Sequence, residues 1–434
     1  MRFLGIGEYC SLGDMYYRLA GAGHEVRVYI ETPEARDIYG GMLQQTPHWY
    51  LELDWVRAAG KDGVIIFESA LKGAIQDRLR RDGFQVIGGS AFGDRLENER
   101  AFGQEILRAL GLPTARVFRH TDFAAAIDFV RAAPARYVFK LNGSDNPRSR
   151  NYVGEMDHGE DMIALLSLQQ AQWPAHAGRP DFVLMEYISG IEVGVGAYFN
   201  GRYFLRPACL DWEHKRFFPG ELGELTDEMG TVVTYRGAER IFEMTLGRTE
   251  ELLAKHGYRG YINLNLIANE RGLWPLEFTS RFGYPGFAIC ETLHTAGWDE
   301  FLCRMLRHDR GELPTAAGFA TGVVLTLPPY PHGYGYEVLS KGVPVSFKGE
   351  LTPAERARLH FSEVALNGDR LVSSGMMGYI GVAAGAGAAV EQAGAQALAL
   401  ARKVVVPNLR YRNDIGARVI ERDLAGLKEL GFIE

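Results

Sequence analysis

One stretch of the sequence, residues 258–286, constrains the fold more than any other. Polar and apolar side chains alternate on both sides of the turn sequence Asn-Glu-Arg-Gly, and the polar positions are Tyr261, Asn263, Asn265, Glu277, Thr279 and Arg281. This alternation predicts two antiparallel strands that share one apolar and one polar face. The amide, carboxylate and guanidinium groups of the polar face suit a hard cation such as Mg²⁺ beside phosphate oxygens. A hairpin whose polar face only meets water would show the same pattern.

The length and composition limit the remaining possibilities. A chain of 434 residues is expected to form about three domains. The net charge of -7 argues against a general nucleic-acid binder, although a local basic pocket for one nucleotide remains open. The cysteines are scattered without CxxC spacing, which argues against a disulfide framework or a zinc site and favours a reducing cytoplasm. The sequence has no apolar run of about 18 residues, so we expect no membrane span.

The first ninety residues alternate strand-like and helix-like segments. This rhythm predicts parallel strands near residues 2–6, 25–30, 63–67 and 84–88, joined by helices at 12–22 and 71–82, with a ligand at the carboxyl ends of the strands. Gly5 and Gly7 follow the first strand as in a phosphate-binding turn. Glu8 and Asp14 would repel a phosphate there, so a tight turn without a phosphate is at least as well supported.

The middle of the chain is expected to carry further polar groups at strand ends. A helix is predicted at 98–110 and an N-capped helix from Thr121, and the strand 136–141 places Lys140 at its end. The polar run 142–154 is either a disordered connector or a lid. We expect a second hairpin at 181–199, a polar loop at 211–230 and a helix at 239–256. The tail is expected to contain short strands and an alanine-rich helix at 388–404.

Taken together, these segments resemble the ATP-grasp superfamily and, within it, the phosphoribosylamine–glycine ligase family. That family ends its catalytic hairpin with a run like Ile-Glu-Phe-Asn-Cys-Arg-Phe-Gly-Asp-Pro-Glu. Here the run is Leu276-Glu-Phe-Thr-Ser-Arg-Phe-Gly-Tyr-Pro-Gly286. The segment Tyr411-Arg-Asn-Asp-Ile-Gly-Ala-Arg418 is similar to the family's closing Arg-Lys-Asp-Ile-Gly-Trp-Arg segment, and the run from Asp211 to Arg216 resembles its Asp-His-Lys-Arg loop. Two matches in the same order are more specific than either alone.

The resemblance implies a fold and a domain division. The expected fold class is α/β, an ATP-grasp fold with an N-terminal Rossmann-like domain and a C-terminal α+β domain. The expected parts are a substrate domain at 1–90, a linker helix at 91–115, a lid subdomain at 116–187, a catalytic subdomain at 188–317 and the C-terminal domain at 318–434.

The resemblance also implies roles for matching positions. Glu277 would be the principal Mg²⁺ ligand, with Asn265 and Thr279 beside it, and Arg281 would act catalytically by neutralising the transferred phosphoryl group. The expected nucleotide-binding residues are Arg100, Lys140, Arg148, Arg150, Glu186, Tyr187, Ile188 and Glu192, of which Lys140 would also be catalytic. The expected substrate residues are Gly7, Glu8, Glu68, His214, Lys215, Asp227, Glu228, Arg281 and Tyr284.

Several positions depart from the family pattern. Asn265 stands in place of a carboxylate and Thr279 in place of an asparagine, which weakens the set of metal ligands. The family's Gly-Asn-Gly-Gly-Arg-Glu-His-Ala phosphate pocket is replaced by residues 5–13, where phosphoribosylamine would be held poorly. Asp227 and Glu228 stand where the family has glycines, and they would either receive a cationic amine or face water.

The resemblance implies an ADP-forming ligase that joins a small-molecule carboxylate to an amine through an acyl phosphate, using ATP and Mg²⁺ or Mn²⁺. We expect substrates that differ from those of the purine enzyme. The alternatives are an authentic phosphoribosylamine–glycine ligase and an ATP-binding protein without ligase activity. A carboxylase of the biotin or aminoimidazole type is less well supported, because the tail is ligase-like. We expect a cytoplasmic monomer or homodimer without nucleic-acid or membrane partners.

Overall fold

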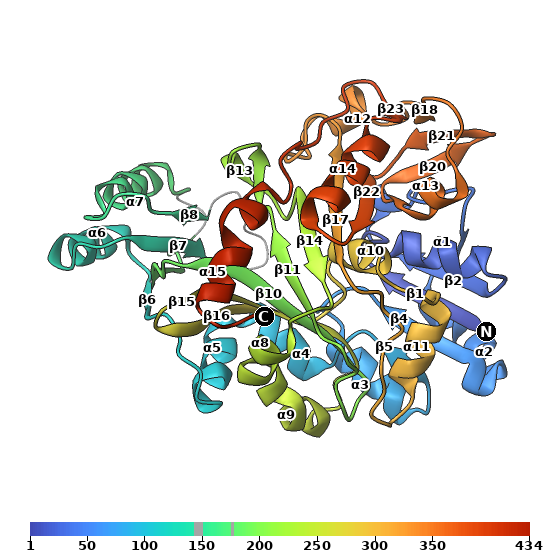
Figure 1. Ribbon diagram of the computed structural model, residues 1–434, viewed down its shortest axis with the longest axis horizontal. Coiled ribbons are helices and arrows are strands. Elements are labelled where there is room, and N and C mark those ends of the chain that lie inside the picture. The colour runs from blue at the N-terminus through green and yellow to red at the C-terminus, as the bar shows by residue number, and fades with distance from the viewer. Residues whose placement is uncertain (143–150, 175–177) are drawn as a thin grey trace.

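The computed structural model describes residues 1–142, 151–174 and 178–434 (Figure 1). The parallel sheet of the N-terminal part lies at one end of the molecule (Figure 1). A small four-stranded sheet, formed by strands between residues 117 and 186 and called the lid sheet here, lies at the other end. A large antiparallel sheet occupies the middle. None of the helices in these described ranges is long and apolar enough to cross a membrane.

The N-terminal sheet is parallel and has the strand order β3-β2-β1-β4-β5. Its strands are β1 (Arg2–Gly7), β2 (Glu25–Ile30), β3 (Gln44–Gln45), β4 (Gly63–Phe67) and β5 (Gln85–Ile87). The helices of this part are α1 (Gly13–Gly21), α2 (Leu53–Ala58) and α3 (Gly73–Arg81). The expected parallel strands and both expected helices are confirmed. The strand order changes direction between β1 and β4, and ligands of such sheets bind at the carboxyl ends of the strands at this point.

The helix expected at 98–110 is α5 (Arg100–Ala109), and a separate helix, α4 (Ala91–Asn98), precedes it within the expected linker at 91–115. Glu99 interrupts them because its backbone, with φ -101° and ψ 81°, is not helical. Glu99 thereby separates two side chains of the candidate site, since Glu97 ends up on α4 and Arg100 begins α5.

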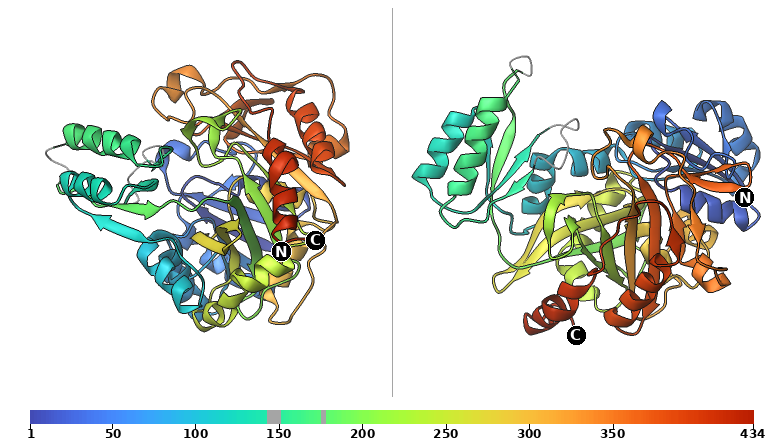
Figure 2. Two further views of the ribbon diagram at one scale, coloured as in Figure 1. Left: turned by 60° about the vertical axis from the view of Figure 1, so that its left-hand side comes forward. Right: turned by 90° about the horizontal axis from the view of Figure 1, so that it is seen from above.

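The lid sheet has the order β6-β9-β7-β8. Its strands are β6 (Val117–His120), β7 (Tyr137–Leu141), β8 (Tyr152–Val153) and β9 (Phe182–Glu186), and its helices are α6 (Phe123–Ala132) and α7 (Glu160–Gln172). The carboxylate of Asp122 accepts a hydrogen bond from the Ala125 N–H, which confirms the expected N-capped helix. Both helices pack against this sheet and project away from the large sheet (Figure 2).

The large sheet has eight strands in the order β16-β15-β10-β11-β14-β17-β22-β19, and neighbouring strands are antiparallel. These strands are β10 (Ile191–Phe199), β11 (Cys209–Glu213), β14 (Gly230–Thr234), β15 (Gly260–Asn269), β16 (Gly272–Thr279), β17 (Phe319–Thr326), β19 (Leu359–Phe361) and β22 (Tyr379–Gly387). Three of them, β17, β19 and β22, follow residue 317. The expected catalytic and C-terminal parts therefore share one sheet, and the domain division itself stays a prediction.

Two expectations for the middle of the chain are wrong. Residues 181–199 do not form a hairpin, because β9 belongs to the lid sheet and β10 to the large sheet. The chain crosses between the sheets at Gly190, where φ is 154° and a Cβ would lie 2.4 Å from the Ala268 carbonyl oxygen. Residues 211–230 are not one polar loop either. Asp211 lies on the central strand β11, and a hairpin of β12 (Arg216–Phe218) and β13 (Leu222–Leu225) follows.

The remaining helices lie between the strands of the large sheet in chain order or follow its last strand. The expected helix at 239–256 is α8 (Glu239–Met244), a 3-10 turn (Leu246–Thr249) and α9 (Glu250–Lys255). The others are α10 (Gly286–Glu291), α11 (Trp298–Leu306), α12 (Tyr336–Leu339), α13 (Pro353–Ala357), α14 (Val390–Ala401), a π-helical turn (Val419–Asp423) and α15 (Leu424–Glu429). The short strands β18 (Ser346–Phe347) and β23 (Val404–Val405) pair with each other, as do β20 (Val364–Asn367) and β21 (Arg370–Ser373). The expected alanine-rich helix, α14, packs on β17 and β22.

Candidate active site

The hairpin expected from the sequence forms at β15 and β16 and is an edge of the large sheet. Asn265 lies directly opposite Glu277, and Asn263 lies opposite Thr279. The amide and carboxylate expected at the metal thus share one row on the polar face, while Leu264 and Phe278 are buried on the other face.

Two cationic side chains converge on Glu277 from other elements. Arg100, at the start of α5, donates from Nη2 to Glu277 Oε2 at 3.2 Å, and Lys140, on β7 of the lid sheet, donates from Nζ to the same oxygen at 3.4 Å. Burial lowers the pKa of Lys140, Glu277 opposes this change, and the neighbouring cations Arg100 and Lys215 reinforce it. The structure therefore brings together the hairpin carboxylate, the linker arginine and the lid lysine that the sequence singled out.

A second group of charges continues from Asn265 across the sheet. The Asn265 amide nitrogen donates to Glu213 at 3.3 Å, and Lys215 Nζ pairs with Glu213 at 3.0 Å and with Glu192 at 2.8 Å. Burial disfavours the Lys215 cation, but Glu192 and Glu213 outweigh burial and raise its pKa well above the usual value. Burial likewise opposes the ionisation of Glu192, yet Lys215 lowers its pKa. Sequence reasoning missed Glu213 because it lies inside the segment that we interpreted as a loop.

The expected adenine hinge lies where the chain leaves the lid sheet. Glu186 ends β9 and accepts hydrogen bonds from the Arg116 backbone N–H at 3.3 Å and from its Nε at 3.1 Å. The guanidinium carbon of Arg136 lies 3.7 Å from the centre of the Tyr187 ring, and Ile188 is buried. Arg148 and Arg150, which were also expected to bind the nucleotide, lie outside the described residues. Most of the polar run 142–154, the segment expected to be either a connector or a lid, lies outside them as well.

Arg281 is held in place by a residue that the sequence did not indicate. Its Nε donates to Glu97 Oε1 at 3.0 Å, and Glu97 Oε2 accepts the Ser280 backbone N–H at 2.7 Å. One carboxylate thus anchors both the side chain and the strand end.

His214 lies away from any open site. It is 1% exposed, its Nδ1 lies 3.1 Å from the Trp212 carbonyl oxygen, and its Nε2 accepts the Gly416 N–H at 3.1 Å. Burial, together with Arg418 and Arg412, lowers the pKa of His214 to about 3, so the ring is neutral at physiological pH. These contacts support a structural role in joining β11 to the chain terminus, and the substrate role expected for His214 has no support from its position.

Glu68 fills the point where the strand order of the N-terminal sheet changes direction. It follows β4, is 4% exposed and accepts the Ser11 backbone N–H at 2.7 Å, in the loop after β1. Its carboxylate lies so close to Gly7 that a Cβ there would be 2.0 Å from Glu68 Oε2. Burial raises the pKa of Glu68 to about 8, although the hydrogen bond from Ser11 opposes the rise. The Glu68 carboxyl group therefore already accepts a backbone N–H that could otherwise donate to a ligand anion.

The two other acids considered for the N-terminal site, Glu8 and Asp14, are already paired. Glu8 forms an ion pair with Lys72, which also pairs with Glu31 at 2.6 Å. Asp14 accepts from Arg18 at 2.6 Å and lies 2.8 Å from His360 Nδ1. Neither carboxylate is therefore available to a cationic amine without the loss of an existing ion pair.

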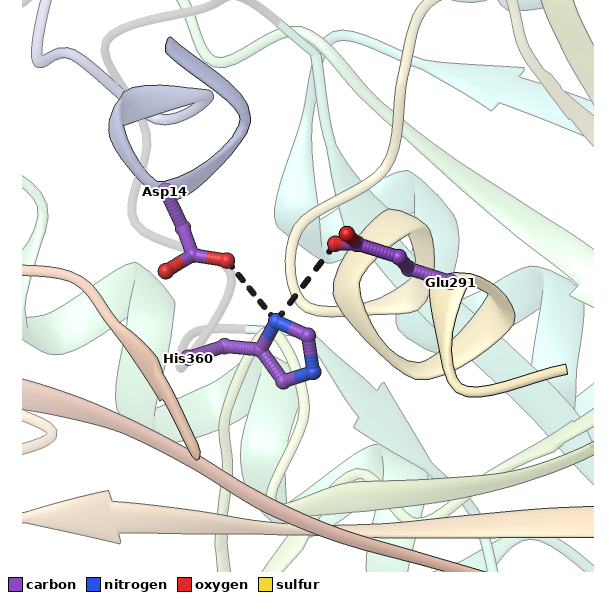
Figure 3. Close-up of side chains that lie close together, drawn as sticks. All are labelled: Asp14, Glu291 and His360. Carbon is purple, nitrogen blue, oxygen red and sulfur yellow. Dashed lines mark hydrogen bonds and ion pairs between the residues drawn. The ribbon is translucent and has the colours of Figure 1, made fainter. Parts of the chain in front are cut away.

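Asp14, Glu291 and His360 form a compact cluster where α1, α10 and β19 meet (Figure 3). Within the described part of the chain, it is the one group of three or more His, Cys, Asp or Glu residues whose ligand atoms all lie within 4.8 Å of one another. Arg18 already supplies a cation to the cluster, because its Nη2 lies 3.0 Å from His360 Nδ1 and its Nε lies 3.4 Å from Glu291. The cluster is therefore a buried ion-pair network, and a metal ion there would have to compete with the guanidinium.

The remaining expected substrate residues differ in exposure. Asp227 is exposed, whereas Glu228 is buried at 6% exposure. Tyr284 is half-buried, and its ring packs edge to face against that of Tyr379 at 5.3 Å. Of these three residues, only Glu228 buries a carboxyl group.

The hairpin, the lid sheet and the parallel N-terminal sheet together define an ATP-grasp fold with a Rossmann-like N-terminal domain. Residues 98–287 match the family model for the phosphoribosylglycinamide synthetase ATP-grasp (A) domain. The chain therefore resembles the ADP-forming carbon–nitrogen ligases of the ATP-grasp superfamily, and phosphoribosylamine–glycine ligase in particular.

Similar proteins support the same conclusion over most of the chain. The phosphoribosylamine–glycine ligase of Nostoc sp. is 28% identical over 365 residues, which cover 81% of this chain and 83% of that protein. The Escherichia coli ligase is 25% identical over 394 residues, covering 82% of this chain and 83% of that protein.

Solved structures extend the likeness of the fold. Phosphoribosylamine–glycine ligase from Thermotoga maritima has a TM-score of 0.71 at 22% identity and covers 96% of this chain and 100% of its own. The biotin carboxylase domain of 2-oxoglutarate carboxylase from Hydrogenobacter thermophilus has a TM-score of 0.62 at 12% identity and covers 94% of this chain and 91% of its own. The shared fold thus extends beyond the matched ATP-grasp domain.

Enzymes of this superfamily use ATP with Mg²⁺, and the residues at the hairpin suit that ion. Glu277 and Glu213 offer carboxylate oxygens on either side of Asn265, which are the hard donors that Mg²⁺ prefers. The Asn265 amide nitrogen is used by Glu213, so the amide oxygen is the atom left to face a cation. Thr279 lies one row further along, opposite Asn263, and its role as a ligand stays a prediction.

Proposed function

We propose that the chain joins a carboxylate to an amine, using ATP, through an acyl-phosphate intermediate. The observation that carries this proposal is the convergence of Arg100 and Lys140 on Glu277, directly across from Asn265. Cations from the linker and the lid therefore meet a carboxylate of the large sheet at one point. This is the charge pattern needed to place nucleotide phosphates beside a metal ion.

In this proposal the side chains position reactants and balance charge. Bound Mg²⁺, held by Glu277 and Asn265, would neutralise phosphate charge. Arg100 and Lys140 would leave Glu277 for the phosphates of ATP, and Arg281, fixed by Glu97, would neutralise the phosphoryl group in transfer. A substrate carboxylate oxygen bonds to the γ-phosphorus and ADP leaves. The amine nitrogen then bonds to the acyl carbon, inorganic phosphate leaves, and the nitrogen loses a proton.

We further propose that the substrates differ from those of the purine enzyme. Glu68 supports this proposal because its carboxyl group already accepts the Ser11 N–H at the end of β1, beside Gly7. A substrate phosphate placed there would compete with Glu68 for this donor and meet Glu8 nearby. The similarity to the Nostoc and Escherichia coli phosphoribosylamine–glycine ligases favours the alternative, an authentic phosphoribosylamine–glycine ligase.

A nucleotide-binding protein without ligase activity is the second alternative. It is favoured by Asn265 and Thr279, which supply fewer negative charges to a metal ion than carboxylates would. The surrounding ion pairs do not distinguish this alternative from the ligase, because ATP binding needs the same cations.

An assay of ADP release tests the ligase proposal and both alternatives together. The purified chain is incubated with Mg²⁺-ATP and either glycine with phosphoribosylamine or a panel of other carboxylate and amine pairs. We expect ADP release with a pair from the panel, its loss in Glu277→Gln, and no release with phosphoribosylamine. Turnover with glycine and phosphoribosylamine would establish the purine activity. Binding of Mg²⁺-ATP without ADP release from any pair would instead support the non-catalytic alternative.

A further inference from the structure

A buried acidic group lies beside the hairpin on the same face of the large sheet. Gly194 on β10 pairs with both Asn265 on β15 and Asp211 on β11, so these three positions form one row across the sheet. Neighbouring strands are roughly 4.8 Å apart, which places Asp211 about 10 Å from Asn265 at the backbone. A Cβ at position 194 would lie 2.2 Å from Asp211 Oδ1. The glycine therefore allows the Asp211 carboxylate to extend over β10 towards the candidate metal site.

Three side chains of this region bury oxygen atoms that lack a hydrogen-bond partner within the described residues. Asp211, Asn263 and Glu228 are each 6% exposed. Asp211 Oδ2 accepts the Asn263 amide at 2.5 Å, but Asp211 Oδ1, Asn263 Oδ1 and Glu228 Oε1 have no partner there. Buried acceptors without donors are costly, and native proteins rarely keep several together.

The charge balance of the group is also unfavourable without a ligand. Asp211 and Glu228 are both buried acids, and Glu213 lies two residues from Asp211 on the same face of β11. The nearby cation Lys215 is paired with Glu192 and Glu213. Together these contacts describe a site that lacks hydrogen-bond donors and positive charge.

A metal ion does not fit this need well. In the part of the chain that the structure describes, the carboxylate oxygens of Asp211, Glu213 and Glu228 do not gather within 4.8 Å of one another. An ammonium or guanidinium group is a better match, because its N–H donors point in several directions and can reach separated acceptors.

We propose that Asp211, Glu228 and Asn263 bind a cationic amino or guanidino group of one substrate, which makes that substrate a basic amino acid or a polyamine. This proposal rests on the proposed ligase function, because it places the cation beside the reacting groups. Asp211 and Glu228 would accept the N–H donors of the cation, and the Asn263 oxygen would complete the site. The bound cationic group is not the nitrogen that forms the amide.

Isothermal calorimetry without nucleotide tests the site separately from catalysis. The probes are L-arginine, which has a carboxylate and a cationic side chain, agmatine and putrescine, which have only the cations, and glycine as the control without a side-chain cation. We expect one of the basic probes to bind and glycine not to bind. Asp211→Asn and Glu228→Gln should each weaken that binding by at least about tenfold, the equivalent of about 1.4 kcal/mol. Glu224→Gln, at an exposed glutamate of β13, should bind like the wild type.

Thermal unfolding of the same variants distinguishes a binding site from a structural cluster. If the carboxylates serve a ligand, Asp211→Asn and Glu228→Gln should keep or raise the melting temperature without a ligand, because each removes a buried acid with an unpaired oxygen. A fall in melting temperature with unchanged probe binding would overturn the proposal, as would the absence of binding by every basic probe.

The two proposals fail in different ways. If a basic probe binds through Asp211 and Glu228 but no pair of substrates releases ADP, the ligase proposal fails and the cation site stands. If ADP is released with substrates that lack a cationic group, and neither variant changes the KM of either substrate, the ligase stands and the cation site is wrong. Binding of L-arginine but not agmatine would assign the site to a basic amino acid, and the reverse would assign it to an amine.

Discussion

Replacing Glu68 by glutamine should change how stability depends on pH. Glu68 is 4% exposed, and burial raises its pKa from the usual 4.5 to about 8. The folded protein therefore keeps this proton over a range of pH in which the unfolded chain has lost it, so wild-type stability falls as pH rises from about 4.5 to about 8. At 1.36 kcal/mol per pKa unit, the total cost is on the order of 5 kcal/mol. Glu68→Gln keeps an oxygen for the Ser11 N–H but cannot ionise.

The measurement is urea unfolding of both proteins at several pH values across this range, with hydrogen exchange of peptides from β1 and β4 to report on the N-terminal sheet. We expect the free energy of unfolding of Glu68→Gln, relative to wild type, to grow steadily from about pH 4.5 to about pH 8 and then to level off. Glu34→Gln, at an exposed glutamate of the same domain, should show no such trend.

The reasoning would be refuted by a difference between Glu68→Gln and wild type that stays constant across this range. It would also be refuted if the wild type became the more stable protein at higher pH, because that sign requires a carboxylate whose pKa is lowered by folding.

Two further predictions concern Glu68 and Arg281. Glu68→Ala should free the Ser11 N–H and create an anion site. Inorganic phosphate should then raise the melting temperature of this variant more than chloride does at the same ionic strength, whereas the wild type should respond equally to both anions. Equal responses of the two proteins would contradict the assigned role of Glu68. Arg281→Lys should lower kcat for ADP release by roughly 10²–10³-fold while leaving the KM for ATP nearly unchanged, because lysine cannot keep the Glu97 contact and also reach the phosphoryl group. Wild-type turnover in that variant would exclude Arg281 from the chemistry.

Local patterns predicted much of the fold. The alternation at residues 258–286 was sufficient to predict β15 and β16 and to place Asn265 and Glu277 on one face, because the period of a strand is two residues. The alternation of strand-like and helix-like segments in the first ninety residues predicted the parallel sheet, because parallel strands are joined by crossover helices.

Errors arose where a segment's partners lay far away in the chain. The segment 181–199 has the pattern of a hairpin, yet β9 and β10 pair with strands of two different sheets. Alternation identifies a strand but not its neighbour. Similarly, Asp211 and Glu213 look like loop acids, but β11 lies between β10 and β14 in the large sheet.

The sequence by itself determined the strands, the polar face of the hairpin and the family resemblance, all of which depend on residues close together in the chain. It also identified Glu277, Lys140 and Arg100 as candidates, through that resemblance. Only the tertiary structure showed that Lys140 and Arg100 meet on Glu277, that Glu97 anchors Arg281, and that Glu68 occupies the end of β1. These contacts join residues from 57 to 184 positions apart, and their burial and charge depend on how separate elements pack.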